Sequence, residues 1–124
     1  MGADLAYIGS AFVATPEARA IEEYKQAIVG GDASDVMGST YFTGIFGNYL
    51  RPSIVRSGLD PDNLPEVEAK QMNFTSRRAS ETKAWRDVWG SGQGIGAVKS
   101  VQPVAEFVAR LEREYAEAKR RLCV

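Results

Sequence analysis

The stretch Leu5-Ala6-Tyr7-Ile8-Gly9-Ser10 sets the expected fold. Its first four residues are apolar and include good strand formers, a pattern typical of a short strand buried on both faces of a parallel sheet. Gly9-Ser10 then ends the strand. A buried parallel strand needs a neighbour on each side, and no strand pattern precedes this one. We therefore expect its backbone N–H and C=O groups to remain unpaired within this chain.

Two amphipathic helices are predicted outward from this strand. The first runs from Pro16 to about Val29, with Thr15 as its cap and Gly30-Gly31 as its end. The second follows Ser100, has Pro103 in its first turn and extends over about five turns. Its apolar residues fall on one stripe, which predicts packing within this chain or against a partner chain. The stripe consists of Val104, Phe107, Val108, Leu111, Tyr115, Ala118 and Leu122.

The middle of the chain is less regular. A short strand is expected over residues 36–40, and a helix over 49–57 that Pro52 either begins or kinks and that Gly58 ends. Residues 66–82 fit a helix and irregular structure equally well. A further short helix is expected over 83–89.

Composition bounds the chemistry. The chain has 124 residues, 15 Lys and Arg against 16 Asp and Glu, one cysteine and no histidine. The charge balance argues against nucleic-acid binding. The missing histidine removes the commonest general base, and one cysteine cannot build a Cys-rich metal site, so no metal site is expected. No apolar run approaches the ~20 residues that span a bilayer, and no signal-peptide pattern begins the chain, so a cytoplasmic location is expected.

Two glycine-bearing segments are candidate ligand contacts. The backbone amides of Gly9, Ser10 and Ala11, with the Ser10 hydroxyl, can approach a phosphate, although a plain strand-to-loop turn explains the same residues. The second segment, residues 90–96, has four glycines in seven positions and includes Gln93 and Gly94. It can expose amides toward an anion or a flat ring system, or serve only as a linker into the last helix.

Aromatic and basic residues next to that loop have simpler explanations. Trp85 and Trp89 lie four residues apart on one face of the expected helix, and we interpret them as core or as an anchor between elements. The basic residues Arg77, Arg78, Lys83 and Arg86 are interpreted as a solvated face.

The order of these pieces resembles the nitronate monooxygenase family, formerly called 2-nitropropane dioxygenases. Residues 2–12 with Ala14-Thr15-Pro16-Glu17-Ala18 resemble the last barrel strand and the following loop of that family. Further matches follow in order along the chain: Tyr24-Lys25-Gln26, Phe42-Thr43-Gly44, residues 48–54, residues 58–61, residues 83–89 and residues 90–94.

The resemblance implies a fold, a cofactor and a reaction. The fold is α/β, an FMN-binding TIM barrel, and the reaction is oxidation of alkyl nitronates with molecular oxygen to a carbonyl compound and nitrite. It implies that Gly9 and Ser10 form half of the FMN phosphate site, and that Gln93 and Gly94 lie near the flavin. A related branch of flavoenzymes reduces enoyl thioesters, and we rank that activity lower because residues 48–54 resemble the nitronate branch more closely.

The chain is too short for a whole barrel, which needs about 250 residues. We expect residues 1–124 to be the carboxyl-terminal part: last strand and helix (1–31), inserted helical subdomain (32–82), then glycine-rich loop and closing helix (83–124). The family's catalytic histidine has no counterpart here, so no catalytic residue is expected in this chain. It would work only with the missing barrel portion or as a homo-oligomer. The alternative is a non-catalytic truncated product or a helical interaction module.

Overall fold

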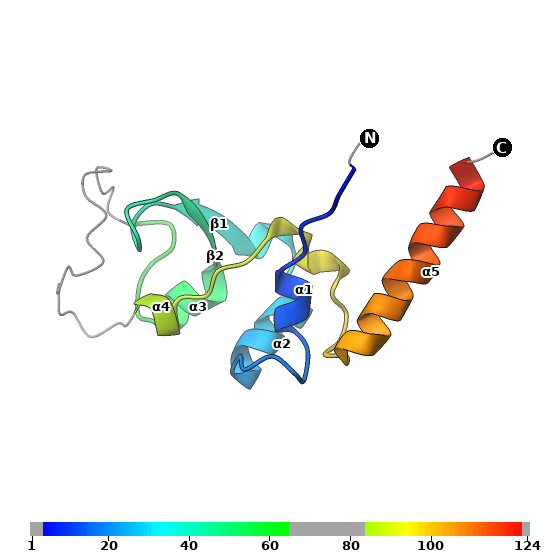
Figure 1. Cartoon of the computed structure of the whole chain (residues 1–124). Helices are drawn as coiled ribbons and strands as arrows, with labels where there is room; N and C mark the ends of the chain where they lie inside the picture. Colours follow the sequence, from blue (N-terminus) through cyan, green and yellow to red (C-terminus); the bar gives the residue numbers. More distant parts are fainter. Residues whose placement is uncertain (1–3, 65–83, 123–124) are drawn as a thin grey trace.

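The computed structural model describes residues 4–64 and 84–122 and is mostly helical, with one two-stranded antiparallel sheet (Figure 1). Among these residues no helix combines the length and the apolar character needed to cross a membrane. The elements in chain order are α1 (Ser10–Val13), α2 (Glu22–Gly30), the 3-10 helix η1 (Ala33–Asp35), β1 (Val36–Ser39), β2 (Gly47–Leu50), α3 (Arg51–Arg56), α4 (Ala84–Asp87), the 3-10 helix η2 (Gln93–Ala97) and α5 (Val104–Leu122).

The strand expected at Leu5–Ile8 is not formed. This segment is irregular and solvent-exposed, with Leu5 92% and Tyr7 104% accessible. No backbone hydrogen bond joins residues 4–8 to another described residue. A strand exists only through pairing with another, and no described residue pairs with this segment, so the expected strand is absent.

The first long helix, α2, begins at Glu22 rather than at Pro16. The hydroxyl of Thr15 donates to the carbonyl of Phe12 (2.8 Å), so it closes the preceding turn and does not cap a following helix. Residues 16–20 form turns and irregular structure instead. The predicted end is nearly correct, because α2 stops at Gly30.

The segment expected to be helical between residues 32 and 64 contains the sheet. The expected strand at 36–40 is confirmed as β1, but its partner β2 was not predicted. They pair with Val36 opposite Leu50 and Ser39 opposite Gly47. Gly44 adopts a φ of 76° in the connection, a backbone conformation that glycine tolerates best. The residues expected to start a helix at 49 belong partly to β2, and α3 follows with Pro52 in its first turn.

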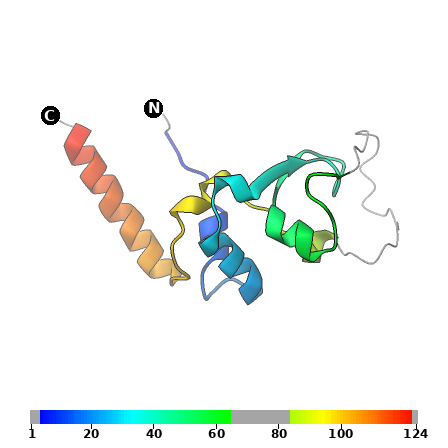
Figure 2. The ribbon, with the colours of Figure 1, turned by 180° about the vertical axis from the view of Figure 1, so that it is seen from behind.

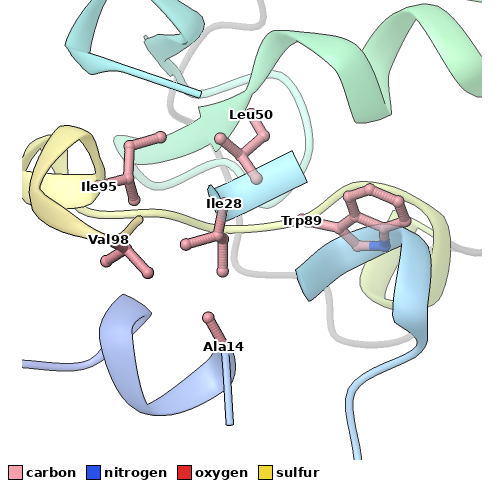
Figure 3. Close-up of a cluster of buried hydrophobic side chains, with 6 residues drawn as sticks. All are labelled: Ala14, Ile28, Leu50, Trp89, Ile95 and Val98. Carbon is pink, nitrogen blue, oxygen red and sulfur yellow. The ribbon is translucent and has the colours of Figure 1, made fainter. Parts of the chain in front are cut away.

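A compact cluster of buried side chains joins elements from both described parts of the chain (Figure 3). Ile28 of α2, Leu50 of β2 and Ile95 of η2 are completely buried. Around them lie Ala14, Trp89 and Val98, each at most 6% accessible. The cluster therefore holds the end of α1, α2, the sheet and the glycine-rich loop together.

The last helix, α5, matches its prediction but packs only at its start. The rings of Phe12 and Phe107 meet edge to face with centroids 5.0 Å apart, and a carboxylate oxygen of Glu17 accepts from the Val104 amide (3.0 Å). Every residue from 112 to 122 is exposed. Figures 1 and 2 show the rest of the helix extending away from the core. The stripe was predicted to pack within this chain or against a partner chain. Among the described residues it packs within the chain at Phe107, whereas residues 112–122 are exposed.

A capping box at η1 makes stability depend on pH. The hydroxyl and backbone N–H of Ser34 donate to Oδ1 of Asp32 (2.6 and 2.7 Å), and these bonds hold the pKa of Asp32 below its ordinary value. A lowered folded-state pKa gives a contribution that is complete above the unfolded-state pKa and lost as the pH falls through the folded-state value. We expect the melting temperature to fall less steeply below about pH 4 in Asp32→Asn than in the wild type. Melting curves followed by circular dichroism check this, with Glu112→Gln as control. Identical profiles for Asp32→Asn and wild type would contradict the assignment.

Candidate functional site

The structure joins the two candidate segments through the side chain of Ser10. Its Oγ accepts a hydrogen bond from the backbone N–H of Gly92 (2.8 Å) and lies 3.4 Å from the hydroxyl of Ser91. Residues 82 positions apart in sequence are thereby in direct contact. The turn after the N-terminal segment and the glycine-rich loop therefore form one site.

Ser10 is placed by the short helix α1. The carbonyl of Gly9 accepts from the amides of Phe12 and Val13 (3.0 and 3.2 Å), which folds the chain into a single turn. Ala11 and Val13 pack against the buried cluster, and Ala14 belongs to it. Ser10 consequently sits at the start of an anchored turn, although it follows an unpaired segment.

Hydrogen bonds to strand β2 fix the position of residues 89–91, where the glycine-rich loop begins. The amide of Leu50 donates to the carbonyl of Trp89 (2.8 Å), and the amide of Ser91 donates to the carbonyl of Asn48 (3.1 Å). Residues 89–91 thus lie antiparallel to β2 and form an isolated β-bridge with it between Gly90 and Tyr49. The buried hydroxyl of Ser53 reinforces it, because its Oγ accepts from the Trp89 amide (2.9 Å) and donates to the Leu50 carbonyl (2.7 Å).

The indole of Trp89 contacts an aromatic ring and a guanidinium group. The ring of Tyr24 stacks on it with centroids 5.0 Å apart and an interplanar angle of 17°, and the guanidinium carbon of Arg56 lies 4.8 Å from its centroid. The Tyr24 hydroxyl donates to the carbonyl of Gly90, and burial raises the pKa of that hydroxyl. The interpretation of Trp89 as core is confirmed. It lies beyond the end of α4, however, and not on a helix that continues to residue 89.

The remaining loop residues turn into η2. Ile95 anchors this turn in the core, whereas Gln93 and Gly94 are exposed. The backbone N–H groups of Gln93 and Gly94 have no acceptor among the described residues, as expected for the first positions of a helical turn. The same holds for the N–H groups of Ser10 and Ala11 at the start of α1.

These groups suit one edge of an anion site. Four amides without acceptors belong to the two segments that meet at Ser10, and amides of this kind bind phosphate oxygens well. There is also room, since a methyl group built at Gly9 or Gly94 would meet nothing within 4 Å. The described residues around Ser10 and Gly92 contribute neutral donors only, and no group of potential metal ligands is found among residues 4–64 and 84–122.

The structure brings Ser10 and the glycine-rich loop together, and it adds Ser91, which was not predicted, at their contact. Ser10 lies at the junction, Gly9 precedes it in open space, and Gln93 and Gly94 lie beyond it without a side-chain partner in the described part of the chain. Ser91, 9% accessible, was not selected. A serine between two glycines carries no distinctive signal, and its burial depends on the pairing with β2. Of the basic run, Arg86 is exposed as expected. The other three members and the side chain of Trp85 lie outside the described residues.

A comparison with known proteins gives one curated relative. Over 125 residues the chain is 29% identical to a nitronate monooxygenase from Paraburkholderia phytofirmans, and the match covers 95% of this chain. The resemblance to nitronate monooxygenases is confirmed. The match covers only 33% of the relative, so the chain spans about a third of the length of the curated protein it matches. A comparison with protein-family models finds no match.

A solved structure shares the fold. The chain aligns with the structure of a FabK mutant (M276A) from Thermotoga maritima with a TM-score of 0.59 over 92% of this chain and 34% of that one. At 20% sequence identity the likeness concerns the fold alone. It shows that this arrangement of helices, hairpin and loop occurs as about a third of a larger chain.

Proposed function

We propose that this chain forms part of an FMN-dependent oxidoreductase of the nitronate monooxygenase type. The observation that supports the proposal is the hydrogen bond between Ser10 and Gly92, a direct contact between two segments that the sequence offered as candidate ligand contacts. The likeness to the Paraburkholderia nitronate monooxygenase supplies the family context. FMN, when bound, supplies the redox chemistry by accepting electrons from the substrate and passing them to oxygen.

The part of FMN that this site suits is its phosphate. The Ser10 hydroxyl and the amides of Ser10, Ala11, Gln93 and Gly94 are donors, and phosphate oxygens are acceptors. Open space at Gly9 lets the phosphate approach the backbone closely. These residues therefore bind and orient the cofactor. Tyr24 and Trp89 act indirectly, because their stacking and the hydrogen bond from Tyr24 to Gly90 hold the first residues of the glycine-rich loop in place.

The proposed reaction is oxidation of an alkyl nitronate by molecular oxygen to a carbonyl compound and nitrite. The chain has no histidine, and among the described residues no carboxylate is hydrogen-bonded at the junction, so we propose that the group that accepts the substrate proton lies outside this chain. The chain would hold the cofactor's phosphate while another part of the enzyme supplies the base. We accordingly expect no nitronate oxidation by the 124-residue chain alone.

Ser10→Ala should weaken FMN binding by about tenfold to a hundredfold, because a hydrogen bond to a charged group is worth roughly 1.5–3 kcal/mol and 1.4 kcal/mol corresponds to a factor of ten. Titration with FMN, followed by the amide resonances of the labelled chain, measures the dissociation constant. Ser10→Thr keeps the hydroxyl and should retain most of the affinity. Ser57→Ala removes a hydroxyl that bonds only within α3 and its cap, and should change nothing. Equal affinities for Ser10→Ala and Ser57→Ala would refute the role of Ser10.

A further inference from the structure

The glycine-rich loop is anchored on each side of its exposed middle. Before that middle, the amide of Ser91 donates to the carbonyl of Asn48 in β2 (3.1 Å). After it, Ile95 is completely buried in the central cluster (Figure 3). We call residues 92–94, which lie between these two anchors, the strap.

A single hydrogen bond ties the strap to a distant segment within the described part of the chain. The backbone N–H of Gly92 donates to Oγ of Ser10 over 2.8 Å. Gln93 and Gly94 are exposed, and the Gly92 carbonyl is bound locally because it accepts from the neighbouring Ser91 hydroxyl (3.2 Å). If the bond to Ser10 breaks, the strap can therefore move between its two anchors.

The closed position of the strap does not itself require glycine at residue 92. Gly92 has a φ of −83° and a ψ of 154°, an extended conformation that other residues adopt easily. A methyl group built on it would lie 3.6 Å from the Ser10 Oγ, which is an ordinary contact. Glycine also has the widest choice of other backbone conformations, and this freedom favours states in which the strap has left Ser10.

The Ser10 hydroxyl can connect a bound anion to this hydrogen bond, because a hydroxyl donates and accepts at the same time. Its oxygen accepts from Gly92, whereas its nearest side-chain oxygen is that of Ser91 at 3.4 Å, a long contact. A charged phosphate oxygen is the stronger acceptor for the Ser10 proton. Donation to phosphate also polarises the hydroxyl and makes its oxygen a better acceptor for the Gly92 amide.

We propose, building on the proposed function, that phosphate binding at Ser10 and closure of the strap are coupled, with the Ser10 hydroxyl as the positioning group that links the ligand to Gly92. A ligand that prefers the closed strap lowers the population of the open one. By linkage, closure raises the affinity for phosphate by the same factor. The strap is thus a conformational device that responds to occupancy of the site.

Amide hydrogen exchange of the labelled 124-residue chain, followed residue by residue by NMR, tests the coupling. With FMN at about ten times its dissociation constant, exchange at Gly92 should slow about tenfold, because the open state is depleted by that factor. Inorganic phosphate at the same multiple should have the same effect, and riboflavin should have none. The control is the Gly44 amide, which donates to the Thr40 carbonyl between the strands (2.8 Å) and should not respond.

Three variants separate positioning from general stability. Ser10→Ala removes the acceptor of the Gly92 amide, so exchange there should be fast with and without ligand, and Ser10→Thr should restore slow exchange. Gly92→Ala restricts the open strap and should raise the protection factor of residue 92 about two- to fivefold without ligand. Ser57→Ala is the matched control, because its hydroxyl bonds to the Ile54 carbonyl within α3, and it should leave Gly92 unchanged.

The results distinguish failure of the coupling from failure of the proposed function. Saturable FMN binding with unchanged exchange at Gly92, or with equal slowing at Gly92 and Gly44, overturns the coupling and leaves the proposed function standing. Slowing by inorganic phosphate but not by FMN supports the coupling and counts against a flavin site. If neither ligand binds, both are contradicted.

Discussion

Trp89→Ala is expected to lower the free energy of unfolding by about 3–5 kcal/mol, enough to leave much of a small chain unfolded. Trp89 is 6% accessible and contacts both the Tyr24 ring and the Arg56 guanidinium. Its removal opens a cavity and deprives Tyr24 of its stacking partner. Because the carbonyl of residue 89 pairs with Leu50, the loss should also release the entry to the glycine-rich loop.

Urea denaturation followed by circular dichroism measures this effect. Trp89→Phe keeps an aromatic ring in contact with the same neighbours and should cost clearly less than the alanine variant. Tyr115→Ala truncates an aromatic residue that is 71% accessible, and should change stability by less than about 0.5 kcal/mol. If Trp89→Ala and Tyr115→Ala were equally mild, the indole would not be a structural anchor.

Ile95→Ala should lower the free energy of unfolding by about 2–5 kcal/mol, because Ile95 is completely buried and belongs to the central cluster (Figure 3). It is the residue that ties η2, and with it Gln93 and Gly94, to the core. Beyond the loss of stability, we expect faster hydrogen exchange at the Gly92 amide as the loop loosens from Ser10.

The matched control for this position is Ile45→Ala. Ile45 is the same residue type but is 54% accessible in the connection between the strands. Truncation of Ile45 should lower the free energy of unfolding by well under half as much as truncation of Ile95. Ile95→Val, which removes one methylene, should cost about 0.5–1.5 kcal/mol. A wild-type midpoint for Ile95→Ala would show that η2 does not pack as described.

Sequence patterns within a few residues correctly predicted features that depend on neighbouring residues, such as the last helix and the glycine after α3. The stripe of α5 recurs at helical spacing and the helix forms where expected, and Gly58 ends α3 with a φ of 80°. The predicted helix start at Thr15-Pro16 was wrong. A threonine before proline suits a helix start, but the Thr15 hydroxyl donates to the carbonyl of Phe12 in the preceding turn. The strand β2 was not predicted because its residues also suit the start of a helix. Only the pairing with β1 decides between a strand and a helix at this position.

Longer-range contacts decided the rest. The segment 5–8 has the composition of a strand, but strand formation depends on a partner that this chain does not provide among its described residues. The contact between Ser10 and Gly92 depends on the pairing of residues 89–91 with β2, and no local pattern encodes it. Sequence patterns therefore selected both segments as candidates, while only the folded chain shows that Ser10 contacts Gly92.

The most direct test of the proposed cofactor site compares two ligands that differ by one phosphate. Amide correlation spectra of the labelled wild-type chain are recorded during titration with FMN and, separately, with riboflavin. We expect saturable shifts at Gly9, Ser10, Gln93 and Gly94 with FMN, and little change at these amides with riboflavin. Spectra that stay unchanged at millimolar FMN, or that change equally with both ligands, would contradict a phosphate site at the junction of Ser10 and the glycine-rich loop.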